Sequence, residues 1–246
     1  MRFDGKAVVV TGGGRGIGEA IGRAFADAGA GVALADIDAD AARAAAATIA
    51  GSVGLGCDVS DRASVETAFA EAVARLGAID ILVNNAGLHT RHYNRPVTVV
   101  PPDAWERMLA VNVMGLVNCA TVAAPLLRQR GGGVILNMSS VSGFDVATAY
   151  GVTKLAIRGL TVALAAELGG QGTRVNALAP GLIHTETIVG DLEEGAAESF
   201  VTQCQLIRRP GIPADLTGAA LFLCSDAAGF VTGETLIVGG GFARRV

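Results

Sequence analysis

The feature that most constrains this chain is a glycine-rich turn, TGGGRGIG at residues 11–18, between an apolar run and a helical pattern. Residues 6–10 (KAVVV) have the unbroken apolar character of a strand buried in a parallel sheet, and residues 19–27 have the spacing of a helix. A strand, a glycine turn and a helix in this order predict an α/β fold whose first turn binds a nucleotide phosphate.

The glycines explain why such a turn can hold phosphates. Gly12, Gly16 and Gly18 permit backbone angles closed to other residues, let the main chain approach a pyrophosphate, and let the helix pack closely on its strand. We therefore expect the phosphates on free N–H groups at the positive end of the helix, beside Arg15 and Ile17. The order is Gly-x-x-x-Gly-x-Gly rather than the commoner Gly-x-Gly-x-x-Gly, so the loop alone is also compatible with a simple tight turn.

An acidic residue after the next strand bears on the choice of cofactor. The apolar run 31–35 ends in Asp36, where a carboxylate can accept hydrogen bonds from an adenine ribose and would repel a 2′-phosphate. NAD is therefore favoured over NADP. Arg15 is the competing signal, because a cation beside the loop could pair with that phosphate. The structural alternative for Asp36 is a solvated carboxylate at a strand end.

Strand and helix patterns alternate along the whole chain. This order predicts a Rossmann-like, doubly wound parallel sheet of about seven strands with helices on both faces, in a single domain over residues 1–246. After the first two strand–helix units, strands are expected at 52–57, 79–83, 133–138 and 174–178, and helices at 62–75, 102–130 and 149–168.

Composition limits the partners. With 246 residues, 51% of them hydrophobic, the chain can bury a large core, and a net charge of −4 with scattered basic residues leaves no footprint for nucleic acid or an anionic membrane. A small-molecule substrate is expected instead. No uninterrupted apolar stretch reaches membrane-spanning length, and the first strand begins too early for a signal peptide, so the expected location is the cytoplasm. The cysteines have no metal-ligand spacing and are interpreted as core residues: Cys57, Cys119, Cys204 and Cys224.

Polar residues and glycines gather where the expected strands end, which is where ligands bind in such sheets. They are Asp58 and Val59, Asn84 to Gly87 (with Asn85 and Ala86 between), Ser139 and Ser140, and Pro180 and Gly181. Asp58 could bond an adenine amino group beside the Val59 amide, or equally cap the next helix. Asn84 and Asn85 could mainly hold neighbouring backbone together.

Taken together, these motifs resemble those of a single-domain short-chain dehydrogenase/reductase. The resemblance rests on the motifs at 11–18 and 84–87, on Asn112, Ser139-Ser140, Tyr150-x-x-x-Lys154 and Pro180-Gly181, and on the segments 209–215 and 232–236. It covers nearly the whole chain. It implies NAD(P)-dependent interconversion of alcohols and carbonyls, in a homo-oligomer that is commonly a tetramer.

Tyr150 and Lys154 can also be interpreted from chemistry alone. Removal of hydride from an alcohol requires a base for the hydroxyl proton, and tyrosine is too weakly acidic by itself. Lys154 lies one helical turn after Tyr150, on the same face, where its charge is expected to lower the phenol pKa. The same amine can reach the ribose hydroxyls of the cofactor.

The resemblance assigns further roles. A serine after the fifth strand would bond the substrate oxygen; Ser140 fits the family's Ser-x-x-Gly step, but the short connection from 143 to 149 leaves Ser139 as an alternative. Asn112 would hold a water in a proton relay from the lysine, the alternative being an amide bonded to nearby main chain. Thr185 would meet the nicotinamide carboxamide beside the Ile183 backbone.

Less patterned segments are assigned to the substrate. Residues 182–208 suit a lid over the substrate, and the basic loop 88–96 could meet a polar or anionic group. His89, His92 and His184 form no metal motif, and no metal is required.

The sequence thus predicts an NAD-dependent oxidoreductase that interconverts a secondary alcohol and a ketone, with Tyr150 as acid and base. An NADPH-dependent reductase of carrier-linked 3-oxoacyl groups is an alternative that Asp36 disfavours. A non-catalytic NAD-binding regulatory protein is another, although it would not need the set Asn112, Ser140, Tyr150 and Lys154 together.

Overall fold

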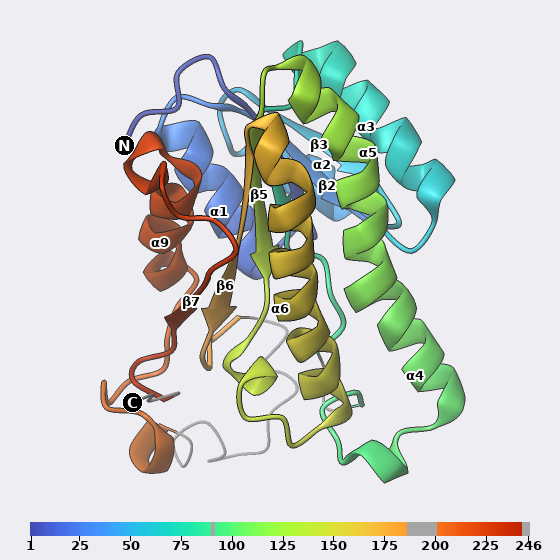
Figure 1. Cartoon of the computed structure of the whole chain (residues 1–246), viewed down its shortest axis with the longest axis vertical. Helices are drawn as coiled ribbons and strands as arrows, with labels where there is room; N and C mark the ends of the chain where they lie inside the picture. Colours follow the sequence, from blue (N-terminus) through green and yellow to red (C-terminus); the bar gives the residue numbers. More distant parts are fainter. Residues whose placement is uncertain (90–91, 186–200, 243–246) are drawn as a thin grey trace.

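The computed structural model describes residues 1–89, 92–185 and 201–242, and its centre is a sheet of seven parallel strands (Figure 1). The strand order is β3-β2-β1-β4-β5-β6-β7. The strands are β1 (Ala7–Thr11), β2 (Gly31–Asp36), β3 (Ser52–Gly56), β4 (Ile81–Asn84), β5 (Gly133–Met138), β6 (Thr173–Pro180) and β7 (Thr235–Val238). The predicted doubly wound parallel sheet is confirmed.

Helices connect the strands and cover both faces of the sheet. The α-helices are α1 (Gly16–Asp27), α2 (Ala39–Ala47), α3 (Arg62–Leu76), α4 (Pro102–Leu109), α5 (Gly115–Gln129), α6 (Ala149–Leu168) and α9 (Ala214–Cys224). The described residues also form single turns of 3-10 helix at Val97–Val99, Val141–Gly143, Gly169–Gln171 and Asp226–Ala228.

Two apolar layers hold the helices on the sheet. Val8 and Val10 of β1 point into a cluster with α1, α2 and α9, whereas Val9 points into a second cluster with α3, α5 and α6. Figure 1 shows α1 and α9 on one side of the sheet and α5 and α6 on the other. Because side chains alternate between the faces and both faces are covered, the central strands need apolar residues at every position. This explains the unbroken run at the start of the chain.

The helix predicted over 102–130 consists of three consecutive helical segments. A π-helical turn, η2 (Ala110–Met114), separates α4 from α5 and contains Asn112. Such turns rotate a helix locally and are frequent at functional sites. Here the turn lies beside the exit of β4.

The same stretch has the length and mean hydropathy of a membrane-spanning helix, although polar and charged residues interrupt its apolar run. The 28 residues Pro102–Gln129 are long and apolar enough to cross a bilayer by length and composition alone. A buried stripe packs this helix against the second apolar cluster instead, through Cys119, Ala120, Ala123 and Leu127. Core helices between a sheet and its neighbours pass the same test.

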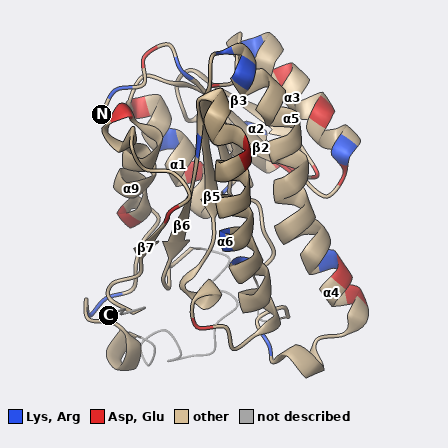
Figure 2. Ribbon diagram, in the orientation of Figure 1, with Lys and Arg blue, Asp and Glu red and all other residues tan. Residues whose placement is uncertain are grey.

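Charged side chains are spread over the outer helices with both signs mixed. In the view of Figure 2, α3 and α4 each carry acidic and basic residues. Several pair within one helix, including Arg62 with Glu66 at 2.9 Å and Arg43 with Asp40 at 2.6 Å.

Candidate active site

A pocket of about 510 Å³ opens at the carboxyl edge of the sheet, where the strand exits meet. Because β1 separates β2 from β4, the chain leaves β1 and β4 in opposite directions and creates a crevice between them. Every predicted site residue except Gly18 and Asn112 lines this pocket: Gly12, Arg15, Gly16, Ile17, Asp36, Asp58, Val59, Asn85, Ala86, Gly87, Ser140, Tyr150, Lys154, Pro180, Gly181, Ile183 and Thr185.

The glycine loop has the geometry that its sequence predicts. Gly12 and Gly16 adopt φ values of 62° and 59°, which favour glycine. A Cβ atom on Gly18 would lie 2.1 Å from the Gly12 carbonyl oxygen, so Gly18 lies behind the pocket wall and permits close contact of α1 with the loop.

The start of α1 is suited to an anionic group. The helix begins at Gly16, and the Arg15 side chain at its N-cap position makes no capping hydrogen bond. The first-turn N–H groups therefore have no side-chain cap, and Gly16 and Ile17 face the pocket. An uncapped helix N-terminus with a glycine cradle fits a pyrophosphate.

Asp36, at the end of β2, supports the glycine loop as well as lining the pocket. Its carboxylate accepts hydrogen bonds from the Gly14 N–H at 2.9 Å and the Asp38 N–H at 3.0 Å. The alternative interpretation of Asp36 as a merely solvated strand-end carboxylate therefore leaves out its hydrogen bonds to the loop backbone.

Arg15 is engaged by an acidic residue that sequence reasoning missed. Its guanidinium pairs with the Asp38 carboxylate at 2.5 Å. The Ala41 N–H and Arg15 hold the pKa of Asp38 below its usual value. Asp38 lines the same end of the pocket as Asp36, so two carboxylates and one paired cation lie there.

Asp58 lies at the pocket, but it does not cap the next helix. Its carboxylate accepts from the Ser60 N–H at 2.9 Å and the Ser60 hydroxyl at 2.7 Å. Asp61 caps α3 instead, by accepting from the Ala63 N–H at 3.0 Å. The capping alternative for Asp58 is wrong, because the chain makes a further turn before the helix begins.

The asparagines after β4 have different structural roles. Asn85 donates to the carbonyl oxygens of Thr11 and Gly12, at 3.0 and 2.9 Å, and so ties the glycine loop to the exit of β4. Asn84 instead donates to the buried side chain of Asn137 in β5 at 3.0 Å. The prediction that these residues hold backbone is confirmed for Asn85, whereas Asn84 pairs with a side chain.

Tyr150 and Lys154 lie at the other end of the pocket, on the first turns of α6. The Thr148 hydroxyl caps this helix by accepting from the Gly151 N–H at 3.1 Å. The Lys154 amine is buried, donates to the Met138 carbonyl oxygen at 2.8 Å, and lies 5.5 Å from the centre of the Tyr150 ring. The i,i+4 spacing therefore brings both groups to one site.

The pKa of Tyr150 corrects one expectation. Burial raises it to about 12 in the protein alone, and a hydrogen bond with Ser140 offsets only part of this effect. Burial also lowers the pKa of the Lys154 ammonium to about 8. The phenol pKa is therefore raised rather than lowered in the protein alone, and the effect of the Lys154 charge on the tyrosinate stays a prediction.

The two serines after β5 have separate partners. The Ser139 hydroxyl is buried and donates to the Lys154 carbonyl oxygen at 2.9 Å. The Ser140 side chain accepts from the Ser142 N–H at 3.1 Å and hydrogen-bonds Tyr150. Ser140 is therefore the serine beside the phenol, and Ser139 anchors α6 to β5.

Asn112 has the main-chain contacts that the alternative interpretation required. Its side chain accepts from the Leu88 N–H at 2.7 Å and donates to the Leu88 carbonyl oxygen at 3.0 Å. It also donates to the Thr153 hydroxyl at 3.1 Å. The π turn thereby joins the exit of β4 to α6, one residue before Lys154.

The wall beyond β6 is built by a short paired segment. Gly181 donates to the Val238 carbonyl oxygen at 3.0 Å, and Ile183 forms an isolated parallel bridge with Gly211. Thr185 lies over the glycine loop, with its methyl group 3.4 Å from where a Gly16 Cβ would be. Most of the predicted lid, residues 186–200, lies outside the described residues, as do residues 90 and 91 of the basic loop.

Some pocket residues carried no motif. Arg107 and Asn94 line the pocket with His89 of the basic loop. Arg107 lies four residues before Val111, on the same face of the helix, and this spacing could have indicated Arg107 as a pocket residue. To use that signal, one must know which face of the helix meets the pocket.

The chain is similar over nearly its whole length to known dehydrogenases and reductases. A family model described as enoyl-(acyl carrier protein) reductase matches residues 12–243. The mouse protein named dehydrogenase/reductase SDR family member 4 is 37% identical over 248 residues, which cover 98% of this chain and 88% of that protein. The 3alpha-hydroxysteroid dehydrogenase of Mediterraneibacter gnavus is 37% identical over 251 residues, 98% of each chain.

A solved structure has the same fold. It is titled 7 alpha-hydroxysteroid dehydrogenase complexed with NADH and 7-oxo glycochenodeoxycholic acid; it is 36% identical, has a TM-score of 0.90, and the match covers 99% of this chain and 96% of that one. The fold and the site define an oxidoreductase that binds a nicotinamide cofactor and acts on hydroxyl or keto groups. The chain belongs to the short-chain dehydrogenase/reductase family.

Proposed function

We propose that this protein is an NAD-dependent dehydrogenase that interconverts a secondary alcohol and a ketone, with Tyr150 exchanging the proton. The observation that carries the proposal is a single pocket that has a nucleotide-binding end and an end with proton-transfer groups. The uncapped start of α1 and the Asp36 carboxylate occupy one end, and Tyr150, Ser140 and Lys154 occupy the other. A protein that only bound the nucleotide would not require a phenol and a buried amine at the second end.

The side chains divide the proton chemistry. The Tyr150 oxygen takes the hydroxyl proton of an alcohol, or returns it to a ketone, while Ser140 donates a hydrogen bond to the same substrate oxygen. The bound nicotinamide would accept or supply the hydride. Lys154, with a pKa of about 8, is mostly protonated at neutral pH, so its charge favours the tyrosinate.

Lys154 is also placed to hold the cofactor. The Met138 carbonyl oxygen takes one of its three N–H donors, and the others remain for ribose hydroxyl groups. Asn112 hydrogen-bonds the Leu88 backbone and the Thr153 hydroxyl, next to Lys154. In this proposal Asn112 also holds the water of a proton relay from the lysine.

NAD is the proposed cofactor because of the charges near β2. Asp36 and Asp38 would repel a 2′-phosphate, and Arg15, the one signal for NADP, is already paired with Asp38. This arrangement also disfavours the second candidate, an NADPH-dependent reductase of carrier-linked acyl groups. The family description that names an enoyl-(acyl carrier protein) reductase keeps that candidate worth testing.

The proposal includes a homo-oligomer, with a tetramer as the expected state. Val152, Leu155 and Val162 are exposed apolar residues of α6, and Leu109 and Met114 are exposed on the neighbouring helix. Apolar side chains gathered on adjacent helices favour burial against another copy. Light scattering of the purified protein measures the mass directly, and a monomer at micromolar concentration contradicts this part.

The experiment is a panel of secondary alcohols with NAD and with NADP, followed by NADH or NADPH absorbance. Tyr150→Phe should lower kcat by about 10²- to 10⁴-fold, the usual contribution of a positioned acid or base. Tyr93→Phe is the matched control, because Tyr93 is the other of the two tyrosines and does not line the pocket. Equal turnover by wild type and Tyr150→Phe would reject the mechanism.

A further inference from the structure

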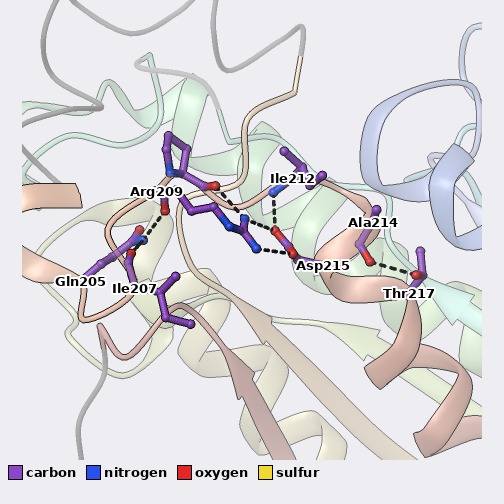
Figure 3. A network of polar contacts seen from close by, with 8 residues as sticks. Gln205, Ile207, Arg209, Ile212, Ala214, Asp215 and Thr217 are labelled. Carbon is purple, nitrogen blue, oxygen red and sulfur yellow. Dashed lines mark hydrogen bonds and ion pairs between the residues drawn. The ribbon is translucent and has the colours of Figure 1, made fainter.

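A polar network lies just outside the pocket, in the segment that leads into α9 (Figure 3). It joins side chains of Gln205, Arg209 and Asp215 to backbone atoms of the turn between them. None of these three side chains lines the pocket described above. Their effect on the site must therefore pass through the backbone that they hold.

Gln205 closes the first half of the turn. Its side-chain amide donates to the carbonyl oxygens of Ile207 and Arg209, at 3.1 and 2.8 Å. The residue is only 4% exposed, so these bonds are shielded from water. One amide thus fixes two backbone carbonyl groups.

Arg209 and Asp215 close the second half. The guanidinium makes two contacts with the carboxylate, at 2.6 and 2.7 Å, and the same carboxylate accepts from the Ile212 N–H at 2.8 Å. Arg209 and this N–H lower the pKa of Asp215 to about 2. The pair stays charged throughout the neutral range and has the geometry of a fork on a carboxylate.

The backbone held in this way is paired with the pocket wall. Gly211 donates to the Leu182 carbonyl oxygen at 3.0 Å and accepts from the His184 N–H at 2.8 Å. A Cβ on Gly211 would lie 2.5 Å from the Ile183 side chain, so the two segments are in close contact. A shift of the 209–215 turn would move Ile183 with it.

The turn is also fixed from its other side. The N–H groups of Leu206 and Ile207 both donate to the Gly240 carbonyl oxygen, at 2.8 and 2.9 Å. Gly240 follows β7, which pairs with β6. The network therefore has a rigid support against the sheet edge.

The strand order tells which part of a cofactor this wall meets. Asp36 ends β2, on one side of the crevice, and Leu182 to Thr185 follow β6, on the other side. With the ribose of adenine at Asp36 and the pyrophosphate at α1, the nicotinamide end lies next to the β6 exit, near Tyr150.

We propose that Gln205, Arg209 and Asp215 are positioning residues, which hold the 182–185 wall against the nicotinamide half of the cofactor. The inference rests on the proposed nucleotide site. An exposed ion pair contributes little to global stability. Its expected effect is therefore on geometry at one end of the pocket.

The test compares two ligands on the whole protein, without turnover. NADH contains the nicotinamide half, and ADP-ribose lacks it. Asp215→Asn removes the charge of the pair, and we expect the Kd for NADH to rise about tenfold, a typical loss for a charge-assisted contact, while the Kd for ADP-ribose stays within about twofold. Arg209→Lys, which keeps the charge but loses the fork, should raise the Kd for NADH by about threefold.

Glu66→Gln is the matched control, because it breaks the exposed Arg62–Glu66 pair on α3 and should change neither Kd. Wild-type levels of NADH binding in Asp215→Asn would overturn the inference, and so would equal losses for NADH and ADP-ribose. If the wild-type protein binds neither ligand, the proposed nucleotide site itself is wrong, which separates the two failures.

Discussion

Replacement of Gly18 by alanine tests how closely α1 must approach the glycine loop. The added Cβ would lie 2.1 Å from the Gly12 carbonyl oxygen and 2.6 Å from the Asn85 side-chain nitrogen. The first neighbour is backbone, and the second is held by its own bonds to Thr11 and Gly12. Neither can rotate away, so the helix and the loop must separate.

The size of the effect follows from that separation. Nonbonded atoms pack at about 3.5 Å, so relief requires a shift on the order of 1 Å in the loop that faces the phosphates. Misplacement of about 1 Å at a binding site can cost about 10²-fold. Overpacking of this kind also lowers the free energy of unfolding by about 1–3 kcal/mol, partly offset by the better helix propensity of alanine.

Fluorescence titration with NADH and urea unfolding measure the two effects. We expect Gly18→Ala to bind NADH about 100-fold more weakly. Gly218→Ala in α9 is the control, because no atom of the described residues lies within 4 Å of its added Cβ. It should stabilise the fold by about 0.5–1 kcal/mol and leave NADH binding unchanged. Wild-type affinity in Gly18→Ala would refute the close-approach argument.

Three further predictions concern charges. Asp36→Ala should lower the ratio of NAD to NADP affinity by about tenfold, since its support of the loop affects both cofactors alike; calorimetry that finds an unchanged ratio rejects Asp36 as the selector. Subtracting the tyrosinate absorbance of Tyr150→Phe from that of the wild type leaves the signal of the Tyr150 phenol, which should ionise near pH 12 without cofactor. A titration midpoint at or below 10.0 would contradict the effect of burial. For Lys154, between its folded pKa of about 8 and its ordinary value of 10.5 the unfolded chain binds more protons, so unfolding free energy should rise with pH there. Urea unfolding should show wild type gaining on Lys154→Met by on the order of 1 kcal/mol per pH unit, and parallel curves would disprove the shift.

The fold and the location of the site could be predicted from local patterns. Apolar runs, helical spacing and glycines at 12, 16 and 18 act over a few residues, and parallel strands bring their exits to one edge whatever the loops contain. For the same reason Tyr150 and Lys154, one helical turn apart, were placed together correctly.

The partners of individual polar groups could not be predicted in this way. Asp58 and Asp61 are both plausible caps in the sequence, and only the path of the chain assigns the cap to Asp61. Asn112 meets Leu88, which lies 24 residues away, because a π turn brings it to the exit of β4.

The sequence by itself determined the order of the strands and helices, the phosphate turn and the pairing of a phenol with an amine, because each depends on neighbours along one element. The tertiary structure alone decided that Arg15 pairs with Asp38, that Asp36 supports the loop, and that burial raises the Tyr150 pKa. Those properties depend on distance and solvent exclusion between segments far apart in the chain, which no local pattern encodes.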